Sequence, residues 1–143
     1  MRIITRAMTL ASLLAVAQGA NAACAAATVK GVWGFSYDAV DLQSPRNCVG
    51  IGLMTFSTGT LSNNTIKITA QRDSCNGDLA KTFAASGTYA VSSICTGKST
   101  NLKYTSSDPG SKLDFNIVEA GTRLQFIMRL SNGITLHGEA LKR

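Results

Sequence analysis

Apolar and polar residues alternate with a period of two along most of the chain after residue 30. The alternation appears in about eight runs, at 32–39, 49–54, 66–71, 83–91, 102–104, 113–117, 123–130 and 134–140. This period is the pattern of half-buried antiparallel strands. No segment in this part of the chain has a convincing helical periodicity, so the pattern predicts an all-β protein.

The connections between the runs are short and contain turn residues. Asp108-Pro109-Gly110 precedes the sixth run, and Ser131-Asn132-Gly133 separates the last two, with an Asn-Gly pair that favours a type I′ hairpin. Tight turns between consecutive runs predict an up-and-down meander, and closure into a barrel removes the exposed edges of such a sheet. We therefore expect one up-and-down antiparallel barrel of about eight strands, with a β-sandwich as the alternative.

The first 22 residues differ from the rest of the chain. Arg2 and Arg6 stand before or beside an apolar stretch, residues 8–17, and the segment ends in Ala20-Asn21-Ala22, a small-x-small cleavage site. This arrangement is typical of a secretory signal peptide, and its apolar part is too short for a membrane-spanning helix. We expect residues 1–22 to be a signal peptide, residues 23–143 to form a single β-barrel domain, and the mature protein to be periplasmic or secreted.

A cysteine close to the expected cleavage site leaves a second form of export open. Bacterial lipoproteins also carry a cysteine directly after their signal, so lipid anchoring at Cys24 is the alternative. Asn21, however, stands where lipoprotein signals usually have leucine. The sequence therefore favours Cys24 as half of a disulfide.

Charge and length limit the partners of the protein. Loss of Arg2 and Arg6 with the signal lowers the formal net charge from +6 to +4, and the remaining basic residues form no run. Binding to nucleic acid needs clustered lysines or arginines that follow the phosphates, so we expect no nucleic-acid partner. We also expect no transmembrane segment and a monomer.

Four cysteines, at 24, 48, 75 and 95, predict two disulfides in an exported chain. Because consecutive strands of a meander run in opposite directions, Cys24 and Cys95 fall at one end of the sheet and Cys48 and Cys75 at the other. The expected pairs are therefore Cys24–Cys95 and Cys48–Cys75. A metal site is not expected, because the chain has no C-x-x-C pair and a single histidine, His137.

The first strand-like run begins with Gly31-Val32-Trp33, which contains the only tryptophan. This stretch resembles the G-x-W motif of lipocalin-like (calycin) barrels. The resemblance implies that Trp33 plugs the closed end of the barrel and that a basic residue after the last strand, Lys142 or Arg143, covers the indole. The segments "SGTYAVSSICTGKSTN", "LDFNIVEAGTRLQFI" and "GITLHGEALKR" also look like small uncharacterised exported proteins of Gram-negative bacteria.

The titratable residues do not form a pattern that indicates catalysis. The acidic pairs Asp38 with Asp41 and Asp73 with Asp78 are expected in turns or on outward positions, and His137 alternates outward on the last run. No G-x-S-x-G elbow and no phosphate-binding loop is present. We expect a protein that is not an enzyme and uses no cofactor.

Two functions from different classes are compatible with this barrel. The first is a carrier of a small hydrophobic ligand, since an eight-stranded barrel can enclose one small molecule. The side chains expected to line its interior are Phe35, Tyr37, Ile51, Tyr89, Phe115, Phe126 and Met128. The second is a protein-binding module, such as an enzyme inhibitor or surface antigen, whose contacts come from the loops at 41–47 and 73–80.

Overall fold

A computed structural model describes residues 23–41, 46–60, 63–76 and 81–143 of the protein. The expected signal peptide, residues 1–22, lies outside the described residues. The described elements are α1 (Ala26–Val29), β1 (Gly31–Asp41), β2 (Arg46–Ser57), β3 (Thr65–Cys75), β4 (Lys81–Thr88), β5 (Ala90–Val91), β6 (Thr96–Leu102), β7 (Ser111–Val118), the 3₁₀ turn η2 (Glu119–Gly121), β8 (Arg123–Arg129) and β9 (Thr135–Lys142).

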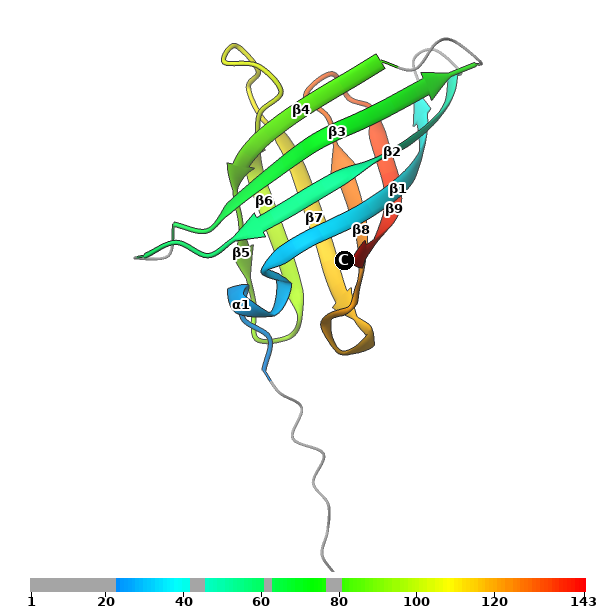
Figure 1. Cartoon of the computed structure of the whole chain (residues 1–143). Helices are drawn as coiled ribbons and strands as arrows, with labels where there is room; N and C mark the ends of the chain where they lie inside the picture. The colour runs from blue at the N-terminus through cyan, green and yellow to red at the C-terminus, as the bar shows by residue number, and fades with distance from the viewer. Residues whose placement is uncertain (1–22, 42–45, 61–62, 77–80) are drawn as a thin grey trace, which may run out of the picture.

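The strands of the described residues form one antiparallel sheet in the order β4-β3-β2-β1-β9-β8-β7-β6-β5. The two ends of this sheet meet, because Ser86 of β4 and Lys103 exchange backbone N–H···O=C hydrogen bonds of 3.0 and 2.9 Å. Tyr89 alone separates β4 from β5, so these two strands act as one bent strand. The result is the up-and-down barrel expected from the sequence, and the sandwich alternative is wrong (Figure 1).

The two ends of the barrel differ. Helix α1 lies at one end, beside the start of β1, and we call this the helix end (Figure 1). At the opposite end, β1 is followed by β2 and the Cys48–Cys75 disulfide joins β2 to β3. None of the helices in the described ranges is long and apolar enough to cross a bilayer.

Alternation along the strands builds the core. β7 has the burial pattern expected of a barrel wall, with Leu113, Phe115 and Ile117 buried and the residues between them exposed. Full burial of one such side chain stabilises the fold by roughly 1.5–3 kcal/mol. The core is aromatic toward the helix end, where the Phe56 ring meets the rings of Trp33 and Phe115 edge-on.

A β-bulge in β3 reverses the alternation halfway along that strand. Ile66 and Ile68 face the interior, but the register shifts between Ile68 and Gln71, and Ala70 adopts the left-handed φ of 52°. Gln71 is consequently buried and Ala70 exposed, the reverse of the alternation read from the sequence. The extra residue in β3 turns the second half of the strand over.

Two local expectations are corrected. The last hairpin has the expected three residues between Leu130 and Ile134, but among them only Gly133 has a positive φ. A type I′ turn needs a positive φ at both central residues, so the hairpin is not of that type. The strand that corresponds to the fifth expected run is β6. It spans Thr96–Leu102, whereas the run was expected at 102–104.

Candidate functional site

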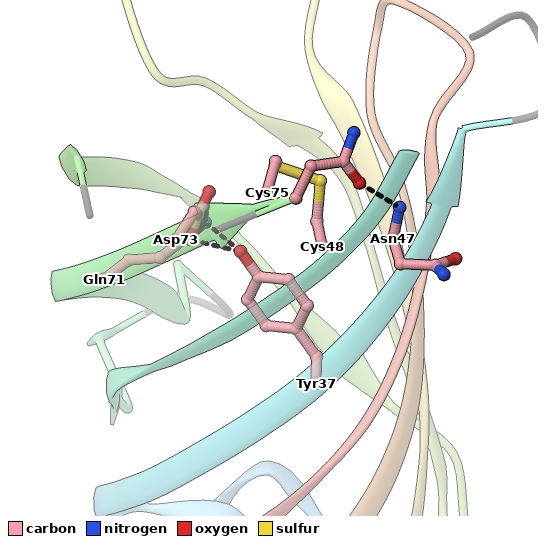
Figure 2. Close-up of a disulfide and its surroundings, with 7 residues drawn as sticks. Tyr37, Asn47, Cys48, Gln71, Asp73 and Cys75 are labelled. Atoms are coloured by element: carbon pink, nitrogen blue, oxygen red, sulfur yellow. Dashed lines mark hydrogen bonds between the residues drawn. A yellow bond between two sulfur atoms is a disulfide. The ribbon is translucent and has the colours of Figure 1, made fainter. Parts of the chain in front are cut away.

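The interior near the Cys48–Cys75 disulfide is polar, in contrast to the apolar helix end. Four side chains converge there: Tyr37 from β1, Gln71 and Asp73 from β3, and Tyr104, which follows β6. We call these four residues the polar cluster. Figure 2 shows the Tyr37 ring reaching across β2 toward Gln71 and Asp73, close to the disulfide.

Continuous hydrogen bonding links the members of the polar cluster. The Tyr37 hydroxyl donates to Asp73 Oδ1, and Gln71 Nε2 donates to the same carboxylate at 3.1 Å and to the Tyr37 oxygen at 3.2 Å. The Tyr104 hydroxyl donates to Gln71 Oε1 at 3.1 Å and lies 3.4 Å from Met128 Sδ. Each residue therefore holds the next in one orientation, which gives the interior a preorganised polar wall.

The environment of the cluster keeps both tyrosines neutral. Burial raises the pKa of Tyr37, and the hydrogen bond to Asp73 raises it further, because loss of the proton would place two negative charges together. Burial likewise raises the pKa of Tyr104, with the charge of Asp73 as the second cause. Both hydroxyls are thus stable donors at any ordinary pH and are unsuited to act as bases.

Two buried hydroxyls beside the cluster have no hydrogen-bond partner among the described residues. Ser99 of β6 and Ser111 of β7 are 2% and 1% exposed, and their Oγ atoms are unpaired. Leu113 lies opposite Ser99 in the sheet and also opposite Met128, which contacts Tyr104. The unpaired hydroxyls and the polar cluster therefore belong to the same region of the interior.

Aromatic rings in the middle of the barrel lie along the wall. Four of them are the direct cross-strand partners of glycines, in the pairs Phe35 with Gly52, Tyr37 with Gly50, Phe115 with Gly97, and Phe126 with Gly138. Each ring occupies the space in which a side chain at the glycine would stand. A ring held over the neighbouring backbone does not extend toward the barrel axis.

The helix end is closed. Trp33 is fully buried and its Nε1 donates to Val29 O of α1 at 2.7 Å. Lys142 Nζ lies 5.5 Å from the centre of the indole and donates to Thr28 O at 3.2 Å. The Cys24–Cys95 disulfide ties the residues before α1 to the turn before β6.

Of the two basic residues expected to cover the indole, Lys142 does so and Arg143 does not, so Arg143 is not part of the plug. Lys142 is the direct cross-strand partner of Trp33 and lies on the same face of the sheet. Arg143, one residue further, falls on the outer face, where its side chain stands over Gly34.

Six of the expected lining residues are buried in the interior, and one is not. Phe35, Tyr37, Tyr89, Phe115, Phe126 and Met128 all belong to the core. Ile51 is 61% exposed and lies opposite Ser36 on the outer face. The residues of β2 that face inward here are Gly50 and Gly52. The rings of Tyr37 and Phe35 on β1 fill the interior space that side chains at these two positions would occupy.

Both disulfides have the pairing derived from the meander, Cys24–Cys95 and Cys48–Cys75. Disulfides are typical of an oxidising extracellular or periplasmic environment. The Cys24 sulfur that is bonded to Cys95 cannot also carry a lipid, so this disulfide and lipid attachment at Cys24 are mutually exclusive.

The other candidates from the sequence do not converge. His137 is exposed on the outer face beside Asp38, its cross-strand partner, while Asp73 lies in the interior. The described residues contain no cluster of His, Cys, Asp or Glu that could hold a metal ion. Asp78 and most of the two loops expected to bind a protein lie outside the described residues.

Gln71, Asp73, Tyr104, Ser99 and Ser111 are the site residues that sequence reasoning missed. The sequence carried no signal for the two from β3: with Ile51 and Ile68 both expected inward, Cys48 and Cys75 fall together on the outer face, and their disulfide then needs no bulge. In the structure Gly50 and Gln71 face inward instead, so the two cysteines share the inner face. The bulge in β3 is what turns residues 71 and 73 inward.

No protein-family model and no curated protein matches the chain. Among solved structures, the chain is similar to the redesigned β-barrel b11L5F_LGL, with a TM-score of 0.58 and 15% identity over 82% of this chain and 94% of that one. It is also similar to the redesigned β-barrel mFAP0 bound to DFHBI, with a TM-score of 0.52 and 19% identity over 80% of this chain and 99% of that one.

These likenesses, at low sequence identity, concern the fold. Together with the strand order and the two disulfides, they define the class of this protein as a small up-and-down antiparallel β-barrel. The resemblance to lipocalins stays a prediction from the Gly31-Val32-Trp33 motif.

Proposed function

We propose that the protein is an exported, non-enzymatic carrier that binds one small, mostly hydrophobic ligand inside the barrel, in the half that contains the polar cluster. The ligand enters at the end with the Cys48–Cys75 disulfide, because Trp33 and α1 close the other end. The alternative of a protein-binding module acting through its loops has no comparable support among the described residues.

The observation that carries the proposal is the pair of unpaired buried hydroxyls, Ser99 Oγ and Ser111 Oγ. Leaving a buried polar group without a partner costs roughly 1–3 kcal/mol. A bound molecule with a hydrogen-bonding group recovers this cost. The surrounding walls, Leu113, Phe126 and Met128, are apolar, so the rest of the ligand is hydrophobic.

Small inward side chains and the placement of the rings are consistent with a small ligand. The rings that lie over glycines are held against the wall, and the inward positions Ala39 and Ala85 carry small side chains. An eight-stranded barrel can be filled by its own side chains or can hold one small molecule. The likeness to the barrel mFAP0, which was solved with DFHBI bound, is consistent with this use of the fold.

The test compares two leucine substitutions on β6 that add apolar volume to opposite faces. Ser99→Leu fills the interior, whereas Thr100→Leu changes the adjacent, exposed residue. The probe is the dye 1-anilinonaphthalene-8-sulfonate, which fluoresces in apolar sites. The parent and Thr100→Leu are expected to bind the dye, and Ser99→Leu to bind it at least about tenfold more weakly, equivalent to 1.4 kcal/mol.

Native mass spectrometry of protein purified from its own host provides a second measurement. A small molecule should accompany the parent and be lost from Ser111→Ala, which removes one hydroxyl without adding volume. Equal dye binding by Ser99→Leu and the parent would show that the interior is not the site. A parent that binds no dye and carries no small molecule would refute the carrier function itself.

A further inference from the structure

The outer face of β2 is apolar, although it points away from the core. Val49 and Ile51 are 55% and 61% exposed, and Leu53, the next outward residue, is partly exposed. Outward faces of antiparallel sheets are normally polar. Burial in the barrel does not explain these three residues, since Gly50 and Gly52 hold the inward positions between them.

A hollow of about 560 Å³ adjoins this strand on the outer surface. Its floor has little side-chain bulk, because the outward residue between Ile51 and Glu139 is the small Ser36, and Ile51 forms part of its wall. The exposed apolar side chain of Ile51 therefore lies next to a hollow that is large enough to hold a side chain of its size. A surface of this kind can accept a copy of its own projecting residue.

Charges on the two sides of β2 have opposite sign. One row across the sheet runs Glu139 of β9, Ser36 of β1, Ile51 of β2 and Arg72 of β3. Asp38, also in the hollow, adds a second carboxylate on the β1 side. Neither Arg72 nor these two carboxylates takes part in an ion pair with another described residue.

We propose that a second copy of this chain covers the hollow and the apolar face of β2 as a two-fold symmetric dimer, in place of the expected monomer. A two-fold axis in the contact plane and parallel to the strands exchanges the two sides of the face. It therefore places Arg72 of each copy over Glu139 of the other and brings each Ile51 to the other copy's hollow. Such an isologous contact needs one self-complementary surface.

Sedimentation measurements over a wide range of concentrations test the apolar part of this contact. The parent is expected to show a concentration-dependent dimer, and Ile51→Asp to raise the dissociation constant at least about 30-fold, the effect of an interface hot spot. Ile94→Asp is the matched control, because Ile94 is 78% exposed in the turn before β6, away from this face. It should leave the dissociation constant unchanged.

A charge exchange tests the orientation. Arg72→Glu and Glu139→Arg should each weaken the dimer by about tenfold, whereas the double variant, which reverses both charges, should regain the parent's affinity. Circular dichroism checks that each variant folds. A parent that stays monomeric at every concentration overturns the proposal, as does a dimer unaffected by Ile51→Asp.

If the parent is a monomer and its β2 face binds a different protein from the host, the proposal that a second copy covers this face is also refuted. The ligand proposal does not depend on this dimer, and neither outcome alters the dye-binding test.

Discussion

The glycine positions beneath the aromatic rings allow a quantitative test of the packing. At Gly97, an added Cβ would overlap the Phe115 ring, and the three nearest atoms all belong to that flexible side chain. At Gly138, an added Cβ would instead overlap the backbone oxygen of Ser36 and stand 2.5 Å from Phe126 Cζ. Neither glycine has a positive φ, so replacing it with alanine tests space alone.

Overpacking of a core typically costs about 1–3 kcal/mol. We expect about 2 kcal/mol for Gly97→Ala, because the Phe115 ring can move, and about 3 kcal/mol for Gly138→Ala, because a strand backbone cannot. A domain of this size loses about 4 °C of melting temperature per kcal/mol. The two variants should therefore melt about 8 and 12 °C below the parent.

A second substitution separates the two causes. Phe115→Leu should recover most of the stability lost in Gly97→Ala, with a coupling energy of about 1–2 kcal/mol in a double-mutant cycle. Phe126→Leu should recover little in Gly138→Ala, because the contact with Ser36 O persists. Gly34→Ala is the control, since its nearest neighbour is the end of the exposed Arg143 side chain at 3.1 Å.

The assays are urea and thermal unfolding, followed by circular dichroism with the disulfides intact. Gly34→Ala should stay within about 0.5 kcal/mol of the parent. A Gly97→Ala variant as stable as the parent, or one that Phe115→Leu does not rescue, would refute the idea that the rings need the glycines beneath them.

Two further predictions concern the ends of the barrel. Trp33→Ala removes a fully buried indole and its hydrogen bond to Val29 O, so it should lower the free energy of unfolding by about 3–5 kcal/mol. Lys142→Met removes only the cation over the ring and should cost no more than about 1 kcal/mol. Equal losses in the two variants would show that the plug depends on charge. Because the folded-state pKa of Tyr37 and of Tyr104 is raised above the unfolded value of 10.0, their stabilising contribution is complete below pH 10 and is lost as the pH rises above it. Unfolding titrations at alkaline pH should show this decline, a smaller one in Tyr37→Phe, and the prediction fails if the two curves run parallel.

Much of the architecture could be predicted from the sequence. The period-two alternation at residues such as Leu113, Phe115 and Ile117 reports which face is buried, because successive side chains of a strand point to opposite sides. Short turns made consecutive strands neighbours, and strand direction then determined which cysteines meet. The disulfide pairs Cys24–Cys95 and Cys48–Cys75 followed from this order alone.

The alternation of apolar and polar residues did not show which side chains face inward where a strand contains glycines or a bulge. On β2, Val49 and Ile51 are more apolar than the glycines between them, yet they face outward. The deciding factor is the neighbouring strand, whose Phe35 and Tyr37 rings occupy the interior over Gly50 and Gly52. Composition along one strand cannot show what its neighbour places across from it.

The sequence by itself therefore determined the class of fold, the order of the strands and the pairing of the cysteines, because these follow from local periodicity and turn length. Only the tertiary structure decided which polar residues face inward. The bulge at Ala70 turned Gln71 and Asp73 into the barrel, and strand pairing brought Tyr37 and Tyr104 to meet them from other walls. A polar cluster assembled from β1, β3 and the end of β6 depends on register between strands, and that register is a property of the closed sheet.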